Sequence, residues 1–472
     1  MKQADPQGRA KERNGTGRPG LVLPVGLLLA CLPAAALACA LPPSVILTLP
    51  TGWYMLGAAA TVGLTALMGA RQHDLPDPAP RLLWSGRLPL PRILTCYLAF
   101  LGFLALLAVG WLGARDPMHN LMTLVFWTGV WIALPLASML LGNLWAALNP
   151  WTAPVRITRA LLGWQGRIGL SRLGHGPAVL GYAGFAWFQI VSLSPEDPFV
   201  LASVAAAYWL VIFLLAVAEG EDWLKQGEFL TVVMGWLARV APLWVDGAGD
   251  RDRLMLGWPG AQITRMAPLS PSAIALLTLV LAALTFDGLA ETFWWQGIIG
   301  QNPLEPVGRS AVIAPNTAGL ALAWALTAAT TLGAIRLGKT LRHGPVMLSF
   351  LAIAAGYHAA HNLVTLLTAG QYTLAALNDP LFRGDSLLGL SDFFVSFGFL
   401  TDPALMPLIY ALQFAAILLA HLLAVYISLK LSAAGPIARP AAAQSAAHLP
   451  LTLLMVGYTS LGLWLLSTAR SA

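Results

Sequence analysis

The feature that most constrains this chain is a series of apolar runs, each roughly long enough for a helix of about 20 residues to cross a bilayer, separated by short polar segments. Only helices and closed barrels can cross the hydrocarbon core, because every backbone polar group must be paired there. Charged residues make up 10% of the sequence, whereas globular proteins in water usually contain about 25%. The sequence therefore predicts an all-α, polytopic transmembrane helical bundle whose main partner is the lipid bilayer.

We expect about ten spans after an N-terminal leader. Residues 1–40 hold basic residues, an apolar stretch and the small residues Ala38-Cys39-Ala40, a pattern typical of a signal peptide or an uncleaved signal anchor. A first membrane half, 41–218, and a second half, 271–472, flank a cytoplasmic connection, 219–270. The predicted spans lie near Thr51–Gly69, Ile93–Gly113, Leu121–Leu141, Pro177–Leu193, Phe199–Ala218, Pro271–Leu289, Ala311–Ile335, Val346–Leu367, Leu405–Ser428 and Leu449–Ser467.

The distribution of basic residues tests this topology, because cytoplasmic loops of membrane proteins collect Lys and Arg. The apolar segment Phe229–Val240 is too short for an ordinary span, and we interpret it as an interfacial helix. With this choice, all but four of the 27 Lys and Arg residues fall on the cytoplasmic side. The sequence thus predicts a multi-pass membrane protein with residue 1 in the cytoplasm. Orientation explains the positive net charge, so we expect no nucleic-acid partner.

Polar side chains within the apolar runs are the candidate functional residues, because burying them in a bilayer is unfavourable unless they are paired. His358 and His361 are three residues apart on one predicted helix and share a face, which Asn362 extends. Helical rise places both histidines near mid-bilayer. Asp287 lies at a similar depth in another predicted span. Its carboxylate could therefore reach the depth of His361, and the alternative is an aspartate that only ends a helix at the outer interface.

This group of residues has three interpretations. His358, His361 and Asp287 could bind a divalent metal ion that activates water, with Asp287 and His361 also acting catalytically. Alternatively, Asp287 could orient His361 in a proton or substrate relay. The third interpretation is interhelical hydrogen bonding without chemistry. The sequence leaves these alternatives open.

Four further polar residues are weaker candidates. Gln413 and His421 are eight residues apart on one span and could both face the bundle interior, while Asn149 precedes Pro150 where a helix should end. Asp379 belongs to a predicted outer loop, Ala369–Asp402, and either serves a loop that covers a site or starts a turn. The chain contains no phosphate-binding loop, dinucleotide fingerprint or nucleophile elbow.

Several short motifs together resemble a bacterial multi-span membrane family labelled fenitrothion hydrolase. They are Asn143–Trp151, Phe286–Leu289, Ala360-His361, Asn378–Gly389 and Leu454–Ser467. The resemblance runs from about Leu41 to the end and carries over Asp287, His361, His421, Asp379 and the Asn149-Pro150-Trp151 group. It implies hydrolysis of an organophosphorus ester and a location in the bacterial cytoplasmic (inner) membrane. Asn362 and Asp385-Ser386 depart from the family pattern, and His358 is additional.

We therefore consider three functions. The first is metal-assisted hydrolysis of a small hydrophobic ester by His358, His361 and Asp287. The second is transport of a small solute or metal ion through the same polar groups. The third is a non-catalytic assembly subunit whose polar groups only hold helices together.

Overall fold

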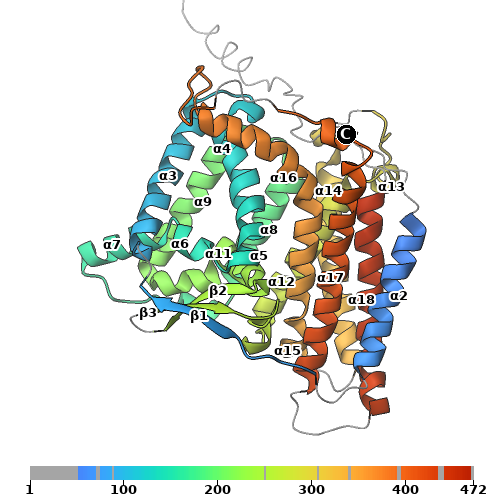
Figure 1. Ribbon diagram of the computed structural model, residues 1–472. Helices are drawn as coiled ribbons and strands as arrows, with labels where there is room; N and C mark the ends of the chain where they lie inside the picture. Colours follow the sequence, from blue (N-terminus) through green and yellow to red (C-terminus); the bar gives the residue numbers. More distant parts are fainter. Residues whose placement is uncertain are drawn as a thin grey trace, which may run out of the picture. The chain divides into compact units, whose positions relative to one another are not determined.

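The computed structural model describes residues 51–70, 75–87, 90–248, 251–305, 308–338, 342–390, 395–433 and 441–468. Helices dominate these residues (Figure 1). The leader predicted at residues 1–40 lies outside them. The helical class expected from the sequence is therefore confirmed.

Eight helical segments in the described part of the chain are long and apolar enough to cross a membrane. Two of them are composite: Leu121–Leu141 joins α4 (Leu121–Leu124), the π-helix η2 (Val125–Ala133) and α5 (Leu134–Leu141), and His343–Asn378 contains α15 (His343–Met347) and α16 (Phe350–Asn378). The others are α3 (Arg92–Leu112), α9 (Pro198–Glu219), α12 (Pro271–Ala290), α14 (Arg309–Leu337), α17 (Leu405–Ala433) and α18 (Ala441–Ser467). These helices identify a multi-pass membrane protein.

Two other predicted spans are also helical in the structure but are not among the eight. They are α2 (Thr51–Gly69) and α8 (Gly176–Ile190). The α8 helix has only 15 residues, because the segment after Ile190 leaves the helical conformation. The predicted span beginning at Val346 differs in the opposite direction, since α16 continues to Asn378. The predicted outer loop therefore begins about ten residues later than expected.

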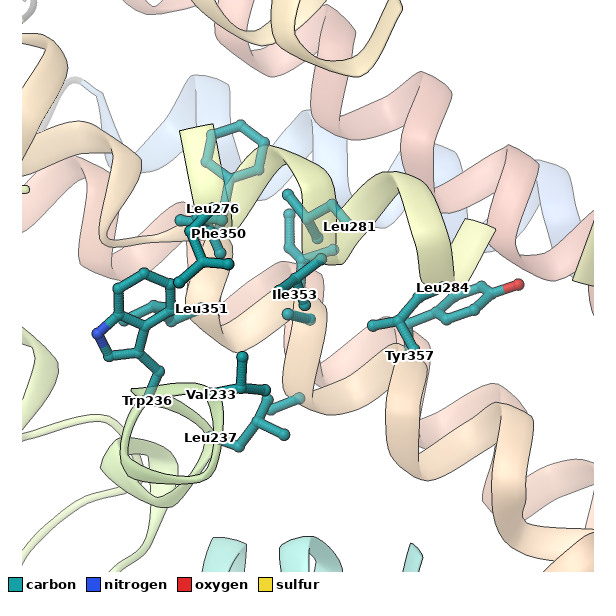
Figure 2. Packing of buried hydrophobic residues seen from close by; sticks show 14 of the residues in the cluster. Val233, Trp236, Leu237, Leu276, Leu281, Leu284, Phe350, Leu351, Ile353 and Tyr357 are labelled. Carbon is teal, nitrogen blue, oxygen red and sulfur yellow. The ribbon is translucent and has the colours of Figure 1, made fainter. Parts of the chain in front are cut away.

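The central helix of the bundle is α12. Of an apolar 18-residue stretch of α12, 72% of the residues are buried, whereas only 17% are buried in the corresponding stretch of α3. It packs against α8, α14 and α16, while α16 also packs along α17, and α2 lies along α18 and α17. Figure 2 shows the core between these helices, where Leu276 and Leu281 of α12 approach Phe350 and Ile353 of α16. A polar group on the α12–α16 face is consequently shielded from most of the surroundings.

The short helix α11 (Phe229–Leu237) belongs to this core. It contacts α5, α6 (Trp145–Leu148), α8 and α16, and Val233, Trp236 and Leu237 are seen beside Leu351 in Figure 2. Seven of its nine residues are buried. Sequence analysis predicted an interfacial helix here, which would bury one side, whereas α11 is enclosed on nearly all sides. Its high apolar content suits that enclosed position.

The remaining short elements connect the long helices. The helical ones are η1 (Pro117–His119), α7 (Thr152–Leu162), η3 (Leu170–Leu173), η4 (Glu221–Trp223), α10 (Leu224–Gly227), η5 (Ala238–Val240), η6 (Ile263–Arg265), α13 (Phe293–Ile298) and η7 (Gly398–Leu400).

A three-stranded antiparallel sheet, which the sequence analysis did not predict, joins two of the predicted cytoplasmic segments. Its strands are β1 (Arg81–Gly86), β2 (Leu243–Ala248) and β3 (Arg251–Leu256), in the order β1-β3-β2. Gly142, just after α5, has φ 85°, and a Cβ atom there would lie 2.9 Å from the Cα of Trp244. Glycine therefore allows the end of α5 to approach β2 closely.

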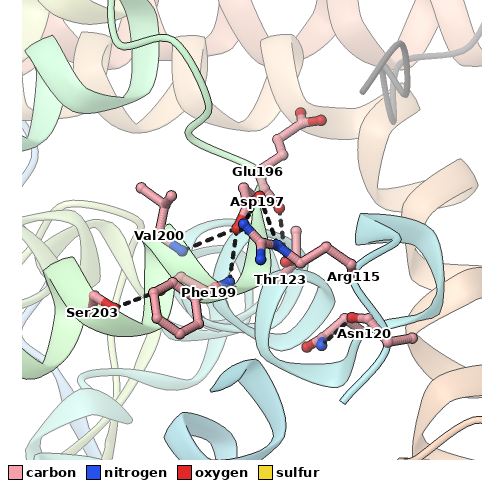
Figure 3. A network of polar contacts seen from close by, with 9 residues as sticks. Arg115, Asn120, Thr123, Glu196, Asp197, Phe199, Val200 and Ser203 are labelled. Carbon is pink, nitrogen blue, oxygen red and sulfur yellow. Dashed lines mark hydrogen bonds and ion pairs between the residues drawn. The ribbon is translucent and has the colours of Figure 1, made fainter. Parts of the chain in front are cut away.

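Polar contacts connect the C-terminal end of α3 to the N-terminal end of α9. Figure 3 shows Asp197 accepting hydrogen bonds from the backbone N–H groups of Phe199 and Val200, which caps α9. The same carboxylate lies 2.9 Å from the guanidinium of Arg115, which follows α3. One aspartate thus both begins a helix and ties it to its neighbour.

Candidate functional site

The candidate site is centred on a carboxylate–imidazole pair. Asp287 lies near the end of α12, and its Oδ2 is 3.0 Å from Nε2 of His361 in the middle of α16. The side chains are largely shielded, with exposed fractions of 21% for Asp287 and 9% for His361. With Asp287 ionised, Nε2 of His361 must carry the proton that is donated. The pair can therefore share, accept or release a proton.

Three neighbours shape the surroundings of this pair. The side-chain amide of Gln189, on α8, donates to Asp287 Oδ2 at 3.4 Å. The ring of Tyr357 is nearly parallel to the ring of His361, with centroids 5.7 Å apart. Gly288 is required next to Asp287, because a Cβ atom there would lie 2.8 Å from the hydroxyl of Tyr357 and 3.7 Å from His361 Nδ1. Three helices thus contribute to one small polar site.

The two ring nitrogens of His361 differ in hydrogen bonding, since Nε2 contacts Asp287 and Nδ1 does not. Among the described residues, Nδ1 of His361 is buried and has no hydrogen-bond partner. Buried polar atoms are normally paired with protein or water. This nitrogen is the atom of the pair that remains available to a proton, a water molecule or a ligand.

His358 does not join the pair, although it shares the predicted helix face. Its ring packs edge-on against Trp131 of η2, with centroids 5.5 Å apart. Asn362 donates to the backbone carbonyl of His358 at 3.0 Å and lies 3.5 Å from its Nδ1. Residues three apart are separated by about 60° around a helix, and here this angle directs the two histidines to different neighbouring helices.

The predicted set of three metal ligands is therefore not gathered in the structure. Within the described ranges, no three His, Cys, Asp or Glu side chains lie together in a way that could hold a metal ion. Asp287 and His361 meet, but His358 faces Trp131. The residues at this position do not fit a three-ligand metal centre.

Two of the other predicted residues lie on α17, and only one of them is hydrogen-bonded to another helix in the described part of the chain. Gln413 donates to the backbone carbonyl of Ala360 at 2.8 Å, directly beside His361. His421 is hydrogen-bonded through Nδ1 to the carbonyl of Ile417 in its own helix. Neither side chain has a hydrogen bond to the Asp287–His361 pair among the described contacts. Gln413 therefore positions the backbone next to the site, and His421 lies apart from it.

Asn149 belongs to a separate buried network. Its carbonyl oxygen accepts from the backbone of Trp151 and Thr152, and its amide donates to the hydroxyl of Thr231 at 2.9 Å. Thr231 in turn donates to Glu228, whose carboxylate also accepts from the hydroxyl of Tyr208 at 2.7 Å. The Asn149–Glu228 network caps the beginning of α11, because the backbone N–H groups at Leu230 and Thr231 also donate to Glu228.

Sequence reasoning identified Asn149 but missed Glu228, which is completely buried. The available signal was the position of Glu228 immediately before an apolar helical run, where an acidic residue typically caps a helix. Burial raises the pKa of Glu228, and the surrounding hydrogen-bond donors oppose that effect. The network is a structural support of the bundle.

Asp379 organises a turn after α16. Its two carboxylate oxygens accept from the backbone N–H groups of Arg383 and Gly384 at 2.9 and 2.7 Å. Phe382, inside this turn, has a positive φ of 52° and its ring lies 4.1 Å from the ring of His119. These contacts agree with the turn-forming alternative for Asp379.

Comparisons of the chain with protein-family models, curated proteins and solved structures found no match.

Proposed function

We propose that this multi-pass membrane protein is a proton-coupled transporter of a small solute, and that Asp287 and His361 together bind the proton. The observation that carries the proposal is the 3.0 Å contact between the carboxylate and the imidazole, formed by two different helices inside the bundle. An ionisable pair within a membrane segment is typical of a proton relay. Part of each side chain is left uncovered by the surrounding helices, which a relay requires.

The arrangement of the helices supports transport. In many transporters, short or interrupted helices meet a polar site in the middle of the bundle. The short, enclosed α11 packs against α16, and the π-helix η2 packs against α16 beside His358. A π-helical segment often occurs at a functional position in a membrane helix. Both irregular elements therefore contact the helix that carries His361.

We further propose that α2 and α8 also cross the membrane, which gives ten spans in the bacterial cytoplasmic membrane. The start of the chain would then lie in the cytoplasm, and the sheet formed by β1, β2 and β3 would lie on the cytoplasmic side. The concentration of Lys and Arg in the corresponding loops supports this orientation.

Hydrolysis of a small hydrophobic ester is the second candidate function, and its support is the resemblance of the sequence motifs to the fenitrothion hydrolase family. His361, oriented by Asp287 and with its Nδ1 unpartnered among described residues, has the arrangement expected of a general base that acts on water. The three predicted metal ligands do not converge among the described residues.

Proteoliposomes that contain a pH-sensitive dye can test the two candidates. A panel of small solutes and divalent ions is added outside, and internal pH is followed for the wild type, Asp287→Asn, His361→Gln and the control His421→Gln. We expect solute-dependent proton movement that is lost in the first two variants and kept in the control. Release of the phenol from an aryl organophosphorus ester, with no solute-dependent pH change in the absence of the ester, would favour the second candidate, and the absence of both activities would contradict both.

A further inference from the structure

A cavity of about 600 Å³ lies away from the Asp287–His361 pair. It is formed by α7, the segment that follows α7, and the residues between the end of α9 and α10. Arg156, Arg159, Arg167, Trp164 and Gln226 are among the side chains that line it. All these residues fall in predicted cytoplasmic loops, next to the ends of membrane helices.

The carboxylates that line the cavity already have partners. Glu219 accepts hydrogen bonds from four consecutive backbone N–H groups, those of residues 168–171, and from the hydroxyl of Ser171. Glu221 lies 2.6 Å from the guanidinium of Arg156, and Asp222 lies 2.7 Å from the ammonium of Lys225. The negative charge at the cavity is therefore compensated locally.

Two arginines of the cavity lack a carboxylate partner within the described structure. Arg159 is held by hydrogen bonds from its guanidinium to the backbone carbonyls of Val217 and Gly166, the latter at 3.0 Å. Arg167 has neither a hydrogen bond nor an ion pair to any described residue, although it lines the same cavity. The lining holds three arginines and three carboxylates, so its formal charge is balanced. The guanidiniums of Arg159 and Arg167 form no ion pair with a described carboxylate, however, and can donate to an anion with several oxygen atoms.

Leu161 and Leu162 lie in the sequence between two lining residues, Ala160 and Gly163, and we call these two leucines the apolar rim. Leu161 and Leu162, at the end of α7, have exposed fractions of 82% and 66%, and Trp164 lines the cavity directly beside them. The beginning of α7 is anchored by the buried residues Ala153, Pro154 and Val155. Basic residues combined with exposed Leu and Trp are the composition of helices that lie in the headgroup region of a membrane.

From this arrangement we propose that the cavity binds the phosphate of an anionic phospholipid of the inner leaflet. Arg159 and Arg167 contact the phosphate oxygens, and the acyl chains follow the apolar rim formed by Leu161 and Leu162. Basic pockets next to the cytoplasmic ends of membrane helices are suited to such headgroups. The assignment of the leaflet rests on the proposed orientation, whereas the binding site is independent of the role of Asp287 and His361.

Native mass spectrometry of the full-length, delipidated protein in detergent tests this proposal. The probe is dioleoylphosphatidylglycerol, compared with dioleoylphosphatidylcholine, whose phosphate carries a neutralising choline. We expect tighter binding of the phosphatidylglycerol, and about tenfold weaker binding of it by Arg167→Gln, because one charge-assisted contact is lost. Arg167→Lys should retain most of the affinity. Arg253→Gln, on β3, removes an exposed charge outside the cavity and should leave binding unchanged.

Arg159→Gln is the second variant, and it should weaken binding to a similar extent. Because Arg159 also holds backbone carbonyls, its folding must be verified by thermal unfolding; Arg167 has no such contact, so its result decides the test. Equal binding of both lipids, or equal effects of Arg167→Gln and Arg253→Gln, would overturn the proposal. Binding of inorganic phosphate that depends on Arg167, together with lipid binding that does not, would also overturn it and would identify a soluble anion as the ligand.

Discussion

Asp287 Oδ2 and His361 Nε2 lie 3.0 Å apart, although 74 residues separate them in the sequence. The carboxylate and the imidazole share one hydrogen bond across two helices, so each side chain fixes the position of the other. Substituting either residue should therefore remove most of the proton-dependent activity proposed for the pair.

We predict that Asp287→Asn and His361→Gln each lower the proton-dependent activity at least about tenfold, and that the double variant is no slower than the slower single variant. The measurement is the initial rate of internal pH change in proteoliposomes. Gln413→Leu serves as a control that alters a neighbour of His361 without removing a titratable group. Multiplicative losses in the double variant would show that the two residues act independently.

Gly356→Ala should destabilise the protein by about 1–3 kcal/mol, the usual range for overpacking a close contact. A Cβ atom at Gly356 would lie 2.2 Å from the Cβ of Ala420 and 2.7 Å from the carbonyl oxygen of Ala416, so α16 and α17 would have to separate. Thermal unfolding in detergent measures the effect. The matched control is Gly370→Ala on the same helix, where the nearest atom would be 3.9 Å away.

Glu228→Gln should destabilise the protein by about 2 kcal/mol or more. The substitution replaces one carboxylate oxygen by an NH₂ group, so the buried donors that faced that oxygen lose their acceptor. The Glu228 carboxylate is surrounded by O–H and N–H groups that donate to it, including the hydroxyl of Tyr208 and the backbone N–H of Thr231. Glu221→Gln is the control, since Glu221 is partly exposed and its ion pair with Arg156 is expected to contribute at most about 1 kcal/mol. Equal unfolding temperatures for the two variants would contradict this account.

The turn after α16 should open at low pH. Hydrogen bonds from the backbone of Arg383 and Gly384 hold the pKa of Asp379 below its ordinary value. The stabilisation is therefore fully present above the ordinary aspartate pKa of about 3.9, and it is lost as the pH falls through the lower folded-state value. Hydrogen exchange of the Arg383 and Gly384 amides, corrected for intrinsic rates, should show this loss of protection.

Asp379→Asn should remove the pH dependence of that protection, whereas Asp385→Asn should preserve it. Protection that falls equally in both variants would mean that the turn is held by other contacts, such as the ring contact between Phe382 and His119.

The membrane class and the approximate positions of the long apolar helices could be predicted from the sequence, because a run of about 20 apolar residues indicates a span. The approach of Asp287 to His361 followed from their depths in two predicted spans. The direction of His358 did not follow, because helical periodicity gives an angle but not the identity of the neighbouring helix. Only the packing of η2 against α16 explains why His358 faces Trp131.

Long-range pairing limited the rest of the prediction. The Asn149–Glu228 network joins residues that are 82 positions apart at its Asn149–Thr231 contact, and neither segment indicates the other. The burial of α11 has the same cause, since its apolar composition suits both a membrane surface and a packed core. In α16, the residues from Thr368 to Asn378 are helical without being uniformly apolar, so a hydropathy criterion ended the helix too early.

During synthesis, β1 is made long before β3, the strand with which it pairs. Arg81 of β1 pairs with Leu256 of β3, so β1 emerges from the ribosome well before its partner strand exists. At usual synthesis rates of about 5–20 residues per second, this delay is roughly ten to thirty seconds. During that time, the backbone edge of β1 has no partner strand. Closure of the sheet therefore follows synthesis of the membrane helices that lie between β1 and β2 in the sequence.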